Sequence, residues 1–433
     1  MQGVKLGCLV LGSLLGVLCV PHVYATNGMN MIAYDAISGG MAGADAAVES
    51  GLTALAANPA NLTSVDTQEL AVDLSLLMPV LHFENTTMMG ANSVDGKKQI
   101  FPLPFLGYAR HLRDTDWYLG VGLFAQGGMG VDFKDVQSGF GTEDSIYSNV
   151  AYGKIAPAVA YKISDRWSLG ASFQLGYSTL SYDFFPATSF YDAGSGMMFP
   201  GQKLENATSF GYSGRIGLNW KFSDQGAFGF SYTSRSKLDY QDADLTMNFS
   251  AMGLGKVKYD AEVDGFEWPD MMDIGVSYYL LDNKLLLAAD ATWYNWKDSM
   301  KTITVSGNNP DNAYAPSNVE IPFVFDWDAQ WEFSFGCAYK LTEIDTLRTG
   351  YNYGKNPVPD QNMYPLFPAI VEHHLAAGYG HEFGQLRLDI AWEHAFEKSA
   401  TNTNADPMHN PFGPDSKVSH DQNTIHMMLT YTF

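Results

Sequence analysis

The chain has 433 residues and a formal net charge of −22 at pH 7, with 42 glycines, 14% aromatic residues and only 17% charged residues. The negative charge argues against nucleic acid as a partner. The length would suit about two or three soluble domains, but no linker or repeat of fixed period divides the chain. Abundant glycine and aromatic residues with few charges are typical of tight turns and aromatic belts around membrane-spanning strands.

Residues 1–25 have the parts of a secretory signal peptide. Lys5 is the only charged residue before the apolar run 6–20, and Ala25 places a small residue at the expected cleavage position. The alternative is a membrane anchor, but a helix that crosses a bilayer needs about 20 apolar residues, so this run is short for one. We therefore expect cleavage after Ala25, which leaves Cys337 as the one cysteine of the mature chain.

Residues 26–67 come next and differ in composition from everything that follows. They are rich in alanine, glycine and asparagine and contain few aromatic residues. Residues 42–57 could form a helix of small residues, but such a helix is too short and too polar to cross a bilayer. A compact segment of this kind, placed before a series of strands, is expected to form a plug inside a barrel.

Long runs of alternating apolar and polar residues occupy the rest of the chain. In residues 166–182, apolar side chains such as Leu169 and Phe173 alternate with polar ones such as Ser172 and Gln174. These runs reach 11–14 residues, whereas strands of soluble proteins usually have about 5–6 and tilted membrane strands need about 9–11. Aromatic residues gather at the ends of the apolar faces, as in an interfacial girdle. The runs predict fourteen strands, near residues 68–84, 99–112, 116–128, 149–163, 166–182, 207–222, 227–240, 270–281, 284–297, 328–341, 345–354, 371–383, 385–398 and 421–433.

The connections between these runs alternate between short turns and long loops. Short turns at one end of the strands and long loops at the other are typical of an outer-membrane barrel, and an even number of strands leaves both barrel ends on the periplasmic side. We therefore predict an all-β protein, a transmembrane antiparallel β-barrel formed by residues 68–433 with the plug, or hatch, of residues 26–67 inside it. The long loops are expected near residues 85–98, 129–148, 183–206, 241–269, 298–327, 355–370 and 399–420.

The last predicted strand ends at Phe433, with apolar residues at alternate positions before it. It could be an ordinary strand that happens to end in phenylalanine. Together with the secretory signal, however, this ending resembles the one that outer-membrane barrels present to their assembly machinery. We expect this machinery and outer-membrane lipid as partners of a monomeric barrel in the outer membrane of a bacterium.

Short motifs spread over the mature chain resemble those of one known family. Each motif is weak alone, but together and in this order they resemble the long-chain fatty-acid outer-membrane transporter family (FadL), which includes the toluene-uptake channels. The resemblance implies a fourteen-stranded barrel closed by a hatch and the passive uptake of hydrophobic small molecules. The motifs lie at residues 39–44, 56–61, 156–161, 167–170, 269–296, 348–351 and 357–359 and in the last strand.

The resemblance also implies a hatch that moves and a gap in the wall that releases the ligand sideways into the bilayer. The hatch motif falls on Asn58, Pro59 and Ala60, and Asn-Pro is a turn signal in its own right. The gap would arise from a kink in the third strand at Gly127, Gly128 and Gly130, where glycines weaken a strand and favour a bulge. The alternatives are a plain turn and a strand that simply runs into a loop.

Fatty-acid members of the family place basic residues near the outer end of the fifth strand, but residues 182–186 of this chain contain no cation. A carboxylate buried there would lack a partner, which favours neutral apolar ligands or a carboxylate site built from other residues. An ion-pair network is the alternative role for the arginines at inward positions. The candidates for the ligand pocket are Phe184, Phe185, Arg215 and Arg348, and the network would join Arg215, Arg348 and Arg387 to Asp290, Glu332, Asp389 and Glu393.

No catalytic motif is found, and we predict neither an enzyme nor a cofactor. His373 and His374 could be imagined as metal ligands, but neighbouring residues of a strand point to opposite faces, so no metal site is expected. The prediction is a channel for hydrophobic small molecules, either long-chain fatty acids or neutral and aromatic hydrocarbons. The alternatives are a general porin, which has no use for a plug, and a surface adhesin, which binds partners through its loops without moving a solute.

Overall fold

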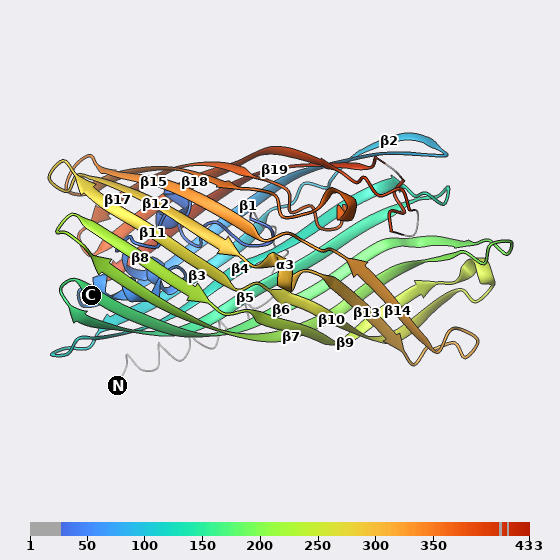
Figure 1. Cartoon of the computed structure of the whole chain (residues 1–433), viewed down its shortest axis with the longest axis horizontal. Helices are drawn as coiled ribbons and strands as arrows, with labels where there is room; N and C mark the ends of the chain where they lie inside the picture. The colour runs from blue at the N-terminus through green and yellow to red at the C-terminus, as the bar shows by residue number, and fades with distance from the viewer. Residues whose placement is uncertain (1–26, 407–408, 414) are drawn as a thin grey trace.

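The structure is a computed structural model that describes residues 27–406, 409–413 and 415–433. The signal peptide predicted for residues 1–25 lies outside the described residues. Figure 1 shows long strands that run obliquely along the molecule and enclose a lumen. Within the described residues, the nineteen strands belong to one antiparallel sheet.

Fourteen of these strands form the closed wall of the barrel. Each of them pairs with two neighbours, and the last strand closes the ring by pairing with the first, from Glu69↔Thr432 to Glu84↔Lys417. The predicted fold class and strand number are thus confirmed. The wall strands, in order around the barrel, are β1 (Gln68–Thr87), β3 (Phe101–His111), β4 (Trp117–Gln137), β5 (Glu143–Ser164), β6 (Trp167–Tyr191), β7 (Met198–Lys221), β8 (Gly226–Thr233), β11 (Met271–Leu280), β12 (Leu285–Tyr294), β15 (Gln330–Lys340), β16 (Asp345–Gly354), β17 (His373–Phe383), β18 (Leu386–Thr401) and β19 (Lys417–Thr432).

Five of the seven long connections at one end of the barrel are largely strands, so their prediction as loops was wrong over much of their length, whereas residues 355–370 and most of 399–420 contain no strand among the described residues. Strands β4 to β7 extend into the predicted loops 129–148 and 183–206. Beyond the bilayer the outer face of a hairpin meets water, so pairing continues while the outward side chains become polar. The strands added at this end are β2 (Gly90–Asp95), β9 (Ser236–Asn248), β10 (Lys256–Trp268), β13 (Thr302–Asn308) and β14 (Asn318–Val324).

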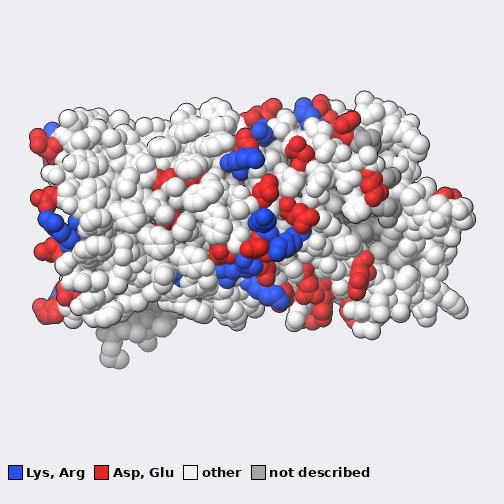
Figure 2. Space-filling view, viewed as in Figure 1, with Lys and Arg blue, Asp and Glu red and all other residues white. Residues whose placement is uncertain are grey.

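The wall strands turn their apolar faces outward and their polar faces to the lumen. On β6, Leu169 and Phe173 are 44% and 56% exposed, while Ser172 and Gln174 are buried. Trp167 and Trp220 stack outside the barrel near the short turns, with ring centroids 5.2 Å apart. Figure 2 shows a broad band almost free of charged residues between charges at the short-turn end and a belt of mixed charges. This band fits the hydrocarbon core of a bilayer.

The segment before β1 lies in the lumen, at the short-turn end of the barrel (Figure 1). Most of its residues from Asn27 to Leu62 are buried, and they contact inward-facing residues of the wall. No helix among the described residues is long and apolar enough to cross a bilayer. The helical turns are α2 (Ala36–Gly40), η2 (Gly51–Leu55) and η3 (Pro59–Ser64) in this segment, and η4 (Ser250–Met252), α3 (Trp296–Ser299) and η5 (Asp360–Asn362) in the connections between strands.

Candidate functional site

The Asn58-Pro59-Ala60 turn fastens the hatch to one side of the wall. Asn58 is the N-cap of η3 and accepts a hydrogen bond from the Ala60 amide at 3.1 Å. Its side-chain amide donates to the Ala46 carbonyl at 2.8 Å and to the Leu218 carbonyl of β7 at 3.0 Å. A Cβ atom on Gly217 would lie 2.0 Å from Asn58 Oδ1, so the turn can approach β7 this closely only because Gly217 has no side chain. Whether the turn moves during transport stays a prediction.

A second set of contacts holds the hatch to β12, three strands further around the wall from β7. Asp290 of β12 accepts hydrogen bonds from the amides of Asp45 and Ala46 at 2.6 and 2.8 Å. Carboxylate oxygens of Asp45, Asp273 and Asp290 lie within 4.8 Å of one another. Burial, with the Asp273 carboxylate nearby, raises the pKa of the Asp45 carboxyl well above its ordinary value. The hatch is therefore joined to the wall at several points through polar groups that water does not reach.

The predicted kink coincides with an interruption of the wall between β3 and β4. The two strands pair from His111↔Tyr118 to Phe105↔Phe124, and in the described chain no β3–β4 pair follows. Residues 101–104 of β3 continue to pair with β1. Residues 102 and 104 are prolines, which have no N–H to donate to a second neighbour. Beyond the interruption, the connection after β2 meets β4 again, where the Lys97 amide donates to the Asp132 carbonyl at 2.8 Å.

Strand β4 does not end at its glycines but bulges there and continues to Gln137. The pairing with β5 shifts register between Ala125 and Gly127, and Gly127 has a φ of +155°. A Cβ atom on Gly127 would lie 2.1 Å from the Met29 carbonyl oxygen, so only glycine fits. Gly130, two residues past Gly128, also lies against backbone, since its Cβ would be 2.7 Å from the Ser148 carbonyl oxygen.

The start of the hatch takes the place of the missing strand beside β4. Asn30 forms a β-bridge with Gly127, and the Gly128 amide donates to the Met29 carbonyl at 3.0 Å. The side-chain amide of Gln126 donates to Asn30 Oδ1 and to the Tyr34 hydroxyl, both at 2.5 Å. Burial raises the pKa of Tyr34 to about 12, so its hydroxyl stays protonated at neutral pH. We call these contacts of residues 29–34 with residues 126–128 the hatch clasp.

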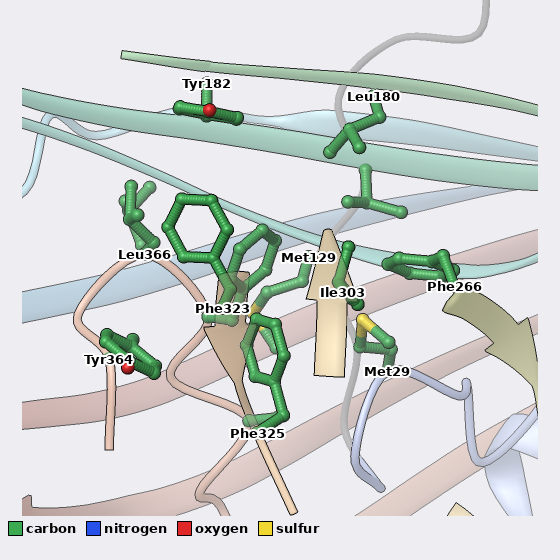
Figure 3. Packing of buried hydrophobic residues seen from close by; sticks show 14 of the residues in the cluster. Met29, Met129, Leu180, Tyr182, Phe266, Ile303, Phe323, Phe325, Tyr364 and Leu366 are labelled. Carbon is green, nitrogen blue, oxygen red and sulfur yellow. The ribbon is translucent and has the colours of Figure 1, made fainter. Parts of the chain in front are cut away.

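An aromatic cluster fills the lumen on the far side of the hatch from the short turns. Figure 3 shows Phe323, Phe325 and Leu366 directed toward one another from β14 and the connections around it. Phe184 and Phe185 are buried in the same cluster, with ring centroids 5.3 Å apart. A cavity of about 20 Å³ lies within it, lined without any charged residue by Leu180, Tyr182, Val263, Phe266, Ile303, Val305, Phe323, Phe325, Leu366 and Phe367.

None of the four pocket candidates lines this cavity itself: the two phenylalanines pack in the aromatic cluster around it, and the two arginines have polar partners elsewhere. Arg348 forms an ion pair with Asp389 at 2.9 Å, and Arg387 binds the same carboxylate at 2.8 Å, as the ion-pair alternative predicts. Arg215 instead binds the hatch, donating to the carbonyls of Ala56 and Ala57, the second at 2.8 Å. The structure therefore separates the phenylalanine candidates from the arginine candidates.

The other acidic members of the expected network have partners that are not arginine. Asp290 holds the hatch amides, Glu332 accepts from Tyr294 at 2.7 Å, and Glu393 lies 3.6 Å from His426. Sequence reasoning missed the hatch clasp, and the one signal for it is the pair of prolines at residues 102 and 104. His374 is buried in the lumen while His373 faces outward, as the alternation requires.

The chain can also be compared with proteins that are already known. Residues 17–433 match the model of a family described as outer membrane protein transport protein (OMPP1/FadL/TodX). The chain belongs to this family. The predicted resemblance is thereby confirmed, and the protein is an outer-membrane transport protein rather than an enzyme.

The relatives of this chain are named for different solutes. The long-chain fatty acid transport protein of Escherichia coli (strain K12) is 20% identical over 364 residues, which cover 76% of this chain and 78% of the relative. The structure of the Pseudomonas putida toluene transporter TodX has 20% identity and a TM-score of 0.75, covering 93% of this chain and 99% of that one. The Ralstonia pickettii toluene transporter TbuX has 18% identity and a TM-score of 0.71, with 93% and 98% covered. At these identities the solved structures establish the fold alone.

Proposed function

We propose that this protein carries hydrophobic small molecules passively across the outer surface of the cell and releases them sideways into the bilayer. The solute class comprises long-chain fatty acids and neutral or aromatic hydrocarbons, which are the kinds of solute for which the relatives are named. The observation that carries the proposal is the interruption between β3 and β4, which the start of the hatch fills. A general porin would have no use for such a removable piece of wall.

The path begins in the aromatic cluster. Solute enters the cluster from the end of the barrel that carries the long connections. Its free energy falls by about 25 cal/mol for each Å² of apolar surface removed from water, so no energy source is needed. Phe184 and Phe185 are proposed to contact the solute there. The cavity of about 20 Å³ must widen to admit a solute, and because no charged residue lines it, we favour neutral hydrocarbons over carboxylates as the solutes that enter there.

Release requires that the hatch clasp opens. Residues 29–31 are held to β4 by two backbone hydrogen bonds and the Gln126 side chain. The segment 56–61 is held to the wall by the bond from Asn58 to the Leu218 carbonyl and by hydrogen bonds that it accepts from side chains of β6 and β7, including Arg215. We propose that the Asn58-Pro59-Ala60 turn acts as the pivot and that residues 27–34 swing away from Gly127, Gly128 and Gly130. Arg215 and Arg348 are then parts of the scaffold, which hold the hatch and the wall in place.

The test is uptake of labelled toluene and labelled hexadecanoate by cells that carry the native protein, the Gly127→Val/Gly128→Val variant or no copy. Valines at the bulge place branched side chains in the interruption, so we expect the uptake gained with the native protein to be lost. Gly153→Val on β5 is the matched control, because a Cβ there meets nothing closer than the Phe124 carbonyl at 3.6 Å.

Uptake of a small sugar, measured in parallel, separates the remaining outcomes. If the native protein admits the sugar but neither apolar solute, the protein is a porin and the proposal is wrong. If it admits none of the three, an adhesin is the better description. If the valine variant admits the sugar while the native protein does not, the substitution has displaced the hatch and opened the lumen. Apolar solutes must then still enter the cell, and their exclusion would contradict the proposed path.

A further inference from the structure

A group of buried polar side chains in the lumen has no role in the contacts described so far. His374 on β17 and Gln422 on β19 both pair with Ala395, which lies between them on β18. His420 is two residues from Gln422 and therefore on the same face of β19. All three side chains are fully buried. The small side chain of Ala395 leaves the space between His374 and Gln422 to these two longer side chains.

Five polar atoms of this group have no hydrogen-bond partner among the described residues. They are both ring nitrogens of His374, Nε2 of His420, and the oxygen and nitrogen of the Gln422 side-chain amide. The other ring nitrogen of His420 lies 3.1 Å from the Pro368 carbonyl oxygen. Buried polar atoms in folded proteins are nearly always hydrogen bonded, so unpartnered atoms in one place call for an external partner.

The chemistry of the group favours an uncharged partner. A neutral imidazole and a carboxamide each offer both donors and acceptors, which suits a hydroxyl or a carbonyl group. Glu393 lies two residues before Ala395 on β18 and therefore on the same face of the wall, where it pairs with Thr424. Its carboxylate would repel an anion. The triad of carboxylates that could hold a metal, Asp45, Asp273 and Asp290, does not include any of these three residues.

The surroundings of the group are apolar. Val418, two residues from His420 on β19, and Ile370, two residues after Pro368, are buried members of the cluster that contains Phe184 and Phe323. A solute held in that cluster can therefore reach the histidines with one polar end. We propose that His374, His420 and Gln422 form a polar subsite of the transport path, which binds the hydroxyl or carbonyl group of an otherwise apolar solute. This inference rests on the proposed function and adds neutral alcohols and carbonyl compounds to its solute class.

The test compares three labelled solutes with the same chain and different ends: hexadecane, hexadecan-1-ol and hexadecanoate. With the native protein, we expect uptake of the alcohol to exceed that of the alkane by about fivefold, the effect of one neutral hydrogen bond, and uptake of the anion to gain nothing from the subsite. The His374→Leu/Gln422→Leu variant is expected to lower alcohol uptake to the rate of the alkane and to leave the alkane unchanged.

The matched control is His394→Leu/Asn423→Leu. It removes the same two chemical groups from β18 and β19, but these side chains are only part-buried, hydrogen bond to each other at 3.1 Å and belong to the opposite face of the strands. This variant should keep the preference for the alcohol. If the double variant at the subsite does not reach the outer membrane, the nearly isosteric Gln422→Met replaces it, with the same expected direction.

Two results overturn the inference without touching the proposed function. Equal uptake of alkane and alcohol by the native protein means that the five atoms bind water only. An equal loss of both solutes in the subsite variant means that the side chains support the wall rather than the solute. If none of the three solutes enters faster with the native protein than without it, the proposed function itself fails.

Discussion

Replacing Asn58 with alanine should loosen the hatch while leaving the barrel intact. The side chain is fully buried and makes three hydrogen bonds, one of which caps η3. Each such bond contributes about 1 kcal/mol, so the three together contribute about 3 kcal/mol. A loss of this size raises the equilibrium constant for local unfolding of the hatch by about 100-fold.

Amide hydrogen exchange, followed by mass spectrometry on the protein in outer-membrane vesicles, measures this opening. Peptides covering residues 27–65 should exchange about 100-fold faster in Asn58→Ala than in the native protein, and wall peptides should not change. Asn92→Ala is the control, because this exposed amide also donates to a carbonyl, that of Asp135 at 3.2 Å, but far from the hatch. The reasoning is refuted if hatch peptides exchange at the native rate, or if hatch and wall accelerate together.

Three further changes test other parts of the structure. Asp389→Asn leaves the buried Arg348 without its counter-charge, which should lower the free energy of unfolding by about 3–5 kcal/mol. The thermal unfolding midpoint of the barrel should fall accordingly, and a midpoint equal to that of the native protein would contradict this. Phe184→Ala makes room beside the ring of Phe323, 6.3 Å away, so uptake of naphthalene relative to toluene should rise by roughly tenfold in a competition assay, and an unchanged ratio would count against a role of Phe184 in the solute path. Deletion of Phe433 should reduce the amount of folded barrel in outer-membrane fractions, as seen on immunoblots, and equal amounts would show that the assembly machinery does not need this residue.

The wall could be predicted from the sequence because the side chains of its strands face lipid and lumen at alternate positions. A strand with lipid on one face and a polar lumen on the other must alternate, and the runs at residues 270–281 and 345–354 therefore identified β11 and β16 closely. The same rule explains the strands that were missed. On β10 the outward Lys258 faces water, while its neighbours Val257 and Tyr259 are buried in the lumen. The strand therefore alternates as well, but its outward face is charged rather than apolar, so it does not match the pattern of a lipid-facing strand.

Site residues could be predicted from the sequence only where the residue type points to one local conformation. The glycines at 127 and 128 and the Asn58-Pro59 turn announce a bulge and a turn by themselves. Arg215 and Arg348 could not be assigned in this way, because an inward arginine is equally suited to a ligand, a hatch carbonyl or an ion pair. The hatch clasp joins Gln126 to Asn30, 96 positions apart in the chain, and no local pattern connects two such distant residues.

The prolines at residues 102 and 104 have a consequence for the speed of the channel. A barrel that opened between two ordinary strands would break a ladder of backbone hydrogen bonds, and its opening rate would be tied to the stability of the whole wall. Here β3 presents an edge that needs no partner over these residues, and the partners of β4 come from a separate segment. If the clasp opens as proposed, the wall can therefore be as resistant to heat and detergent as any closed barrel while the opening is frequent. Substitutions that tune the clasp can change the rate of transport without changing the durability of the protein.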